Sequence, residues 1–200
     1  LDLSLGMQAA QGSYRHAAVA RPIAFTLDAL QIKAGRGQRL HGSAHGSLQG
    51  QPTRLSIRAA SVPEMLRDRA LPLDLELAQA QATLRMQGRL NPAEAVRDTA
   101  LGFELQARRA GDLARWLPVA PQSSLPLALR GQLRLSPDAW SLGQTTLEIG
   151  RSRLRIDARQ SRGAGRPLTT LSLRSTAIDG PELATLFAGT RAPGQADARL

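Results

Sequence analysis

Leucine alternates with charged or polar residues over long stretches of this chain, and this period of two restricts the fold more than any other feature. The alternation runs through Leu71, Leu73, Leu75 and Leu77, and it recurs over 82–90, 101–107, 127–135 and 154–158. Successive side chains of a strand point to opposite faces, so the leucines share one face and the charged residues share the other. The sequence therefore predicts a sheet with one apolar face and one charged face.

Eleven segments carry the strand pattern, and short connections separate them. They lie at roughly 1–6, 22–33, 38–48, 53–60, 71–77, 80–90, 99–108, 125–135, 140–148, 151–160 and 168–177. Short connections rich in Gly favour antiparallel neighbours over crossover units. The apolar residues change phase between Leu27 and Leu30, which predicts a β-bulge near Asp28 and Ala29.

Helical patterns are few and short. Three of them, at 61–66, 111–117 and 180–187, follow a strand and place apolar residues at i, i+3 and i+4, which gives a short helix one apolar stripe. A weaker one follows Asn91. We interpret the chain as one domain with possible repeat units at 21–66, 71–117 and 124–187.

Composition limits the functional classes. The net charge is +10 and the 26 basic residues include a single lysine, Lys33, which favours anionic partners, although a solvated outer face is the simpler interpretation. There is no cysteine, which excludes disulfides and thiolate chemistry. Aromatic residues make up only 3% of the chain, which argues against binding of single-stranded nucleic acid.

No catalytic constellation is recognisable. The chain has no Gly-x-Ser-x-Gly elbow and no dinucleotide fingerprint. His41 and His45 are four residues apart, about 13 Å along a strand, which is too far to share one metal ion. Of the two tryptophans, Trp116 is expected to pack on the sheet from its short helix, and Trp140 to cover an edge of the core. We therefore expect a non-enzymatic protein with no catalytic residue, metal or cofactor.

The large apolar face needs a cover, and the short helices are too few to supply it. Either the sheet closes on itself as a sandwich or barrel, or it curves into a groove that something else fills. In the second case the lining is predicted to be Leu73, Leu75, Leu77, Leu84, Met86, Leu101, Phe103, Leu105, Leu127, Leu129, Leu133, Leu154 and Ile156.

The stretch from Leu71 to Phe187 resembles the AsmA family of Gram-negative envelope proteins. The likeness lies in the strand patterns LPLDL at 71–75, ATLRMQGRL at 82–90, FELQA at 103–107 with GDLARWL at 111–117, and LPLALRGQL at 125–133. It continues through WSL at 140–142 and IGRSRLRID at 149–157, where Arg151 stands in place of the usual acidic residue.

The resemblance implies a mainly β fold, an antiparallel curved sheet that forms a β-groove, in a periplasmic domain tethered to the inner membrane by an anchor outside these residues. It implies a part in outer-membrane biogenesis and intermembrane phospholipid transport, with acyl chains along the groove and possible envelope-protein partners. The chain begins and ends within strand-like patterns, so we expect a fragment of a longer protein. The alternative is a self-buried β-sandwich that acts as a scaffold for envelope protein assembly, through its outward arginines or its edge strands.

Overall fold

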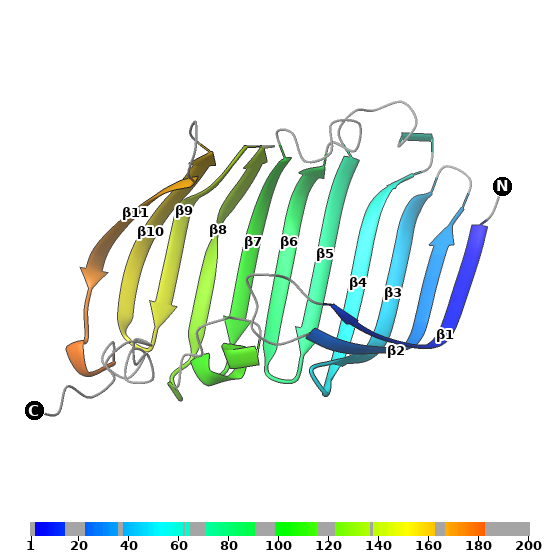
Figure 1. Cartoon of the computed structure of the whole chain (residues 1–200), viewed down its shortest axis with the longest axis horizontal. Coiled ribbons are helices and arrows are strands. Elements are labelled where there is room, and N and C mark those ends of the chain that lie inside the picture. The colour runs from blue at the N-terminus through cyan, green and yellow to red at the C-terminus, as the bar shows by residue number, and fades with distance from the viewer. Residues whose placement is uncertain are drawn as a thin grey trace, which may run out of the picture.

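The computed structural model is a single antiparallel sheet of eleven strands, each paired with its neighbours in the chain (Figure 1). It describes residues 3–14, 23–35, 38–61, 63–64, 71–90, 99–115, 123–136, 138–162 and 167–182. The strands are β1 (Leu3–Tyr14), β2 (Ile23–Ala34), β3 (Arg39–Leu48), β4 (Gln51–Ser61), β5 (Leu71–Gln79), β6 (Ala82–Leu90), β7 (Thr99–Ala107), β8 (Leu127–Ser136), β9 (Ala139–Ile149), β10 (Ser152–Arg162) and β11 (Pro167–Ala177).

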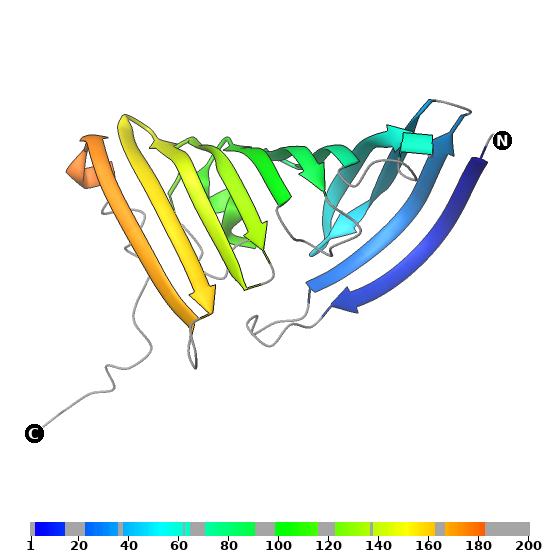
Figure 2. The same ribbon diagram turned by 90° about the horizontal axis from the view of Figure 1, so that it is seen from above.

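The sheet is open and curved. Figure 2 shows it as an arch, with β1 and β11 as the two feet and the central strands at the crown. Strand order follows chain order from β1 to β11, and no pairing joins the first strand to the last. This confirms the predicted mainly β, antiparallel curved sheet, and the described strands form one open sheet rather than two facing sheets.

The strand register aligns the leucines of neighbouring strands across the sheet. Leu77 of β5 lies opposite Leu55 of β4 and Leu84 of β6. The row then continues through β7 to β10 as Leu105, Leu129, Leu147 and Leu154. A slip by one residue would move a whole strand's leucines to the opposite face, so this alternation fixes the register.

One short helix identifies the concave face. The 3₁₀ helix η2 (Ala110–Arg115) lies inside the arch in Figure 2 and in front of the sheet in Figure 1. Its Leu113 is 1% exposed and belongs to a buried cluster with Ala107, Leu127 and Ile149 of the apolar face. The apolar face is therefore the concave one. We call it the inner face, and the charged face the outer face.

Bulges keep the apolar phase on the inner face where the sequence pattern shifts. Ala9 and Asp28 face each other unpaired between the pairs Gln8–Ala29 and Ala10–Leu27, and Ala9 has a φ of 53°. The β2–β3 register shifts at the same place. The predicted bulge at Asp28–Ala29 is therefore confirmed.

The predicted short helices are only partly within the described residues. Helical turns occur at 63–64 and 180–182, and η2 covers most of 111–117 as a 3₁₀ helix. The helix expected after Asn91, the side chain of Trp116 and the remaining parts of 61–66 and 180–187 lie outside the described residues. In the described part of the chain, no helix is long and apolar enough to cross a membrane.

Candidate functional site: the concave apolar face and its rim

Three rows of apolar residues run across the inner face, perpendicular to the strands. The middle row consists of Leu5, Ile32, Gly42, Ile57, Leu75, Met86, Phe103 and Gly131. The upper row consists of Leu40, Ala59, Leu73, Gly88, Leu101, Leu133, Leu142, Ala158 and Leu171. The lower row consists of Met7, Leu30, Ala44, Leu55, Leu77, Leu84, Leu105, Leu129, Leu147 and Leu154. Together they make a continuous aliphatic surface from one foot of the arch to the other.

All thirteen residues predicted to line a groove fall on this face. Eleven of them belong to the three rows: Leu73, Leu75, Leu77, Leu84, Met86, Leu101, Phe103, Leu105, Leu129, Leu133 and Leu154. Leu154 ends the lower row, Ile156 lies two residues further along β10, and Leu127 lies below the rows beside Ile149. The predicted lining did not include the row members of β1 to β4, among them Leu5, Leu30, Leu55 and Ile57.

Exposure varies systematically over the inner face. Leu101, Leu105 and Leu127, near the crown of the arch, are 6–8% exposed. At the feet, Leu5 and Met7 of β1 are 53% and 45% exposed, and Leu171 and Leu173 of β11 are 59% and 58% exposed. Large contiguous apolar patches on a protein surface commonly mark interaction or ligand-binding sites.

The helix η2 closes the lower side of the inner face over β6 to β9. Its start is held by backbone hydrogen bonds from Ala110 N to Leu125 O (2.8 Å) and from Gly111 N to Ser123 O (2.9 Å). Leu113 then covers Ala82, Ala107 and Ile149 in the buried cluster. The inner face therefore has a packed lower side beneath its three apolar rows.

The outer face carries charge in two different arrangements. Over β5 to β8, the cross-strand neighbours Glu76, Arg85, Glu104 and Arg130 alternate in sign, and Arg85 Nε lies 3.2 Å from Glu76 Oε2. Such exposed ion pairs contribute little to stability, about 0–1 kcal/mol each. Over β10 and β11 the pattern changes, because Arg155 lies directly opposite Arg174 and neither makes an ion pair within the described residues.

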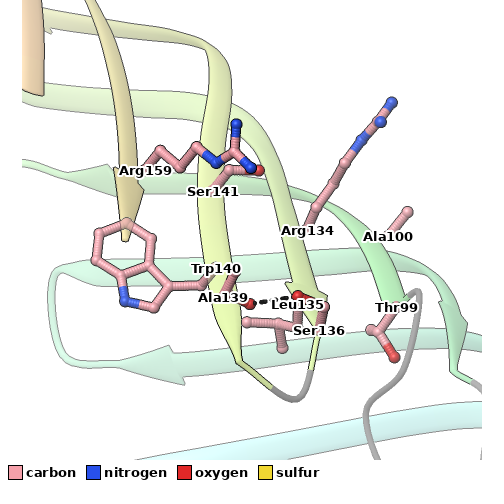
Figure 3. A pocket seen from close by; sticks show the side chains of 9 residues that line it. All are labelled: Thr99, Ala100, Arg134, Leu135, Ser136, Ala139, Trp140, Ser141 and Arg159. Atoms are coloured by element: carbon pink, nitrogen blue, oxygen red, sulfur yellow. Dashed lines mark hydrogen bonds between the residues drawn. The ribbon is translucent and has the colours of Figure 1, made fainter. Parts of the chain in front are cut away.

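A hollow of about 350 Å³ lies near the ends of β7 to β10 (Figure 3). On the outer face its lining includes Arg134, Ser141 and Arg159, which are successive neighbours across β8, β9 and β10. Figure 3 shows these three side chains on one side of the sheet, and the hydroxyl of Thr99 directed to the other. Trp140, whose indole nitrogen donates to Gln160, also lines the hollow.

The two histidines considered as metal ligands are exposed residues of β3. His41 lies opposite Arg58 and His45 opposite Arg54. Among the described residues, no three His, Cys, Asp or Glu side chains come close enough together to hold a metal ion. His16 lies outside the described residues.

Comparisons of this chain with protein-family models, with curated proteins and with solved structures give no match.

Proposed function

We propose that this chain is a non-enzymatic, AsmA-like envelope module that carries lipid acyl chains along its inner face. The observation that supports the proposal most strongly is the set of three aliphatic rows, which continue across successive strands of an open sheet. An acyl chain placed along these rows would meet only hydrocarbon, while polar groups at its end would stay in water at the rim.

The free energy of burial supports an apolar occupant. Each Å² of apolar surface removed from water contributes about 25 cal/mol. Among the described residues, the four most exposed large hydrophobic side chains of the inner face, Leu5, Met7, Leu171 and Leu173, lie on the outermost strands at the two feet. A ligand gains most burial free energy when it covers the exposed residues at both feet. A long hydrocarbon chain can reach both feet and a compact ligand cannot, so the rows favour long chains.

The resemblance to the AsmA family agrees with this arrangement and supplies the proposed context. In that context the module is periplasmic, tethered to the inner membrane through an anchor outside these residues, and takes part in outer-membrane biogenesis by moving phospholipid between membranes. Its partners are phospholipid acyl chains and envelope proteins.

The direct test asks whether lipid accompanies the protein. We expect the 200-residue chain purified from a Gram-negative host to release phospholipid into organic solvent, detected by mass spectrometry. We also expect the delipidated chain to take up a fluorescent fatty acid. A folded chain that carries no lipid and takes up no fatty acid would contradict the proposal.

The second candidate is a scaffold that assembles envelope proteins, and β11 favours it, since its outer edge pairs with no other strand of the described residues. This strand is eleven residues long, and its leucines Leu168, Leu171 and Leu173 are 58–66% exposed. Long apolar edge strands are templates for the addition of another strand. A lipid-free chain that nevertheless binds an extended envelope peptide would favour the scaffold.

A further inference from the structure

We propose that the hollow at the ends of β7 to β10 binds a phosphate-bearing lipid head group, with Arg134 and Arg159 on either side of the phosphate and Ser141 beneath it. This inference rests on the proposed function, because it assigns the head-group end of the lipid whose chain lies on the inner face. The three residues line one hollow of about 350 Å³ (Figure 3).

The strand register sets the spacing of the two arginines. Ser141 of β9 pairs with Arg134 of β8 on one side and with Arg159 of β10 on the other. Neighbouring strands are about 4.8 Å apart, so the two arginine backbones are about 10 Å apart across a small residue. Two guanidinium groups that extend from such positions can meet on one phosphate, for which their planar donor pattern is suited.

Among the described residues, the cross-strand row that holds Arg134, Ser141 and Arg159 contains no carboxylate. The row continues from Arg134 to Ala100 of β7 and then to Arg89 of β6, so arginines alternate with small residues. Within the described residues, no ion pair involves Arg89, Arg134 or Arg159. The acidic residue nearest in sequence to Arg159, Asp157, accepts a hydrogen bond from the backbone amide of Gln144 (3.2 Å).

A second hollow on the outer face shows the contrast. It is larger, about 600 Å³, and contains Arg85 and Arg130, but Glu104 lies between them in the cross-strand row. That carboxylate balances the positive charge and would repel a phosphate. The Arg134–Ser141–Arg159 row has a serine at the equivalent place, so it can accept an anion.

The hollow is also in the right place for a lipid. Arg134 is two residues from the end of β8, and Ser141 is two residues from the start of β9. The intervening Leu135 and Trp140 pair with each other on the inner face, beside the upper apolar row. A lipid with its phosphate at Arg134 and Arg159 can therefore pass its chain over the strand ends, along Leu135 and Trp140, to the inner face.

The test compares two double variants with the same change in net charge. Arg134→Gln/Arg159→Gln removes the proposed phosphate ligands, whereas Arg155→Gln/Arg174→Gln removes two outer-face arginines outside the hollow. The probes are dihexanoyl phosphatidylglycerol, glycerol 3-phosphate and a short-chain diacylglycerol without phosphate, each measured by calorimetry or fluorescence. Circular dichroism and unfolding midpoints establish that the variants are folded.

We expect Arg134→Gln/Arg159→Gln to weaken phosphatidylglycerol binding about tenfold or more, because the charged hydrogen bonds to the phosphate are lost. Diacylglycerol binding should stay unchanged, and Arg155→Gln/Arg174→Gln should have an effect below about threefold. Equal losses in the two double variants would indicate general attraction to positive charge and overturn the site.

Two further outcomes separate this proposal from the function on which it rests. If diacylglycerol and phosphatidylglycerol bind equally well to the unaltered chain, the head-group site is wrong although the apolar face still carries lipid. If glycerol 3-phosphate binds as tightly as phosphatidylglycerol, the hollow binds free phosphate and not a lipid. If none of the three probes binds, the lipid function itself fails.

Discussion

At the scale of single residues, small side chains on the inner face are required by close contacts between strands. A Cβ atom added to Gly88 would lie 2.1 Å from the carbonyl oxygen of Ala100 and 2.9 Å from Leu101 Cα. The outer-face Gly102, on the neighbouring strand, has its nearest such contact at 3.6 Å, from Gln87 O. A methyl group therefore fits at Gly102 but not at Gly88.

Gly88→Ala is expected to destabilise the fold by about 1–3 kcal/mol, because the backbone of β7 must move to admit the methyl group. Gly102→Ala, the matched control, should change the free energy of unfolding by less than about 0.5 kcal/mol. Urea unfolding followed by circular dichroism measures both values. Equal stabilities for the two variants would contradict the close approach of β6 and β7 at Gly88.

The sequence pattern could place Gly88 in the apolar phase and Gly102 in the polar phase. It could not show which glycine is essential, since the clash depends on the position of the partner strand's carbonyl.

The row of Arg134, Ser141 and Arg159 could not be predicted either. These residues belong to three different strands, and only the register between the strands brings them into one row. For this reason the sequence alone did not point to the proposed phosphate site.

At the scale of elements, the alternation predicted ten of the eleven strands nearly to their ends. The exception is β1, which was expected over 1–6 but extends to Tyr14. Its second half escaped prediction because the bulge at Ala9 shifts the phase, after which the inner-face positions hold the small residues Ala10 and Gly12. A helix as short as η2 gains its order from packing, through Leu113, more than from local propensity.

Leu113→Ala should therefore cost about 2–5 kcal/mol, as expected for a fully buried leucine, and should release η2 from the inner face. Leu168→Ala, at a side chain that is 66% exposed, serves as the control and should leave stability within about 0.5 kcal/mol. Thermal unfolding gives the stability difference, and hydrogen exchange at Ala110 and Gly111 reports whether η2 opens. Unchanged protection of these amides in Leu113→Ala would show that η2 is held by its backbone hydrogen bonds alone.

At the scale of the whole molecule, the arch divides the inner face into a packed crown and open feet. Leu105, at the crown, is 8% exposed within the buried cluster, so a charge there would test the stability of the fold and not the binding of a ligand. Leu173, in β11, lies on the inner face opposite Ile156 and is 58% exposed. A charge introduced at Leu173 can remain in water in the free protein. Its effect on ligand binding therefore shows whether a ligand covers this face.

Leu173→Asp should leave the fold intact and weaken fatty-acid uptake about tenfold, because hydrocarbon seated on the row would have to desolvate the carboxylate. Leu168→Asp is its matched control: it lies on the same strand, is similarly exposed, and points to the outer face opposite Ser161. Both variants are titrated with a fluorescent fatty acid, and their unfolding midpoints are measured. The comparison distinguishes an effect of the inner face from an effect of any charge added to β11. Equal losses would mean that the added charge weakens uptake whichever face carries it, which would contradict binding on the inner face, whereas a loss confined to Leu173→Asp is the result that a hydrocarbon chain lying along the inner face requires.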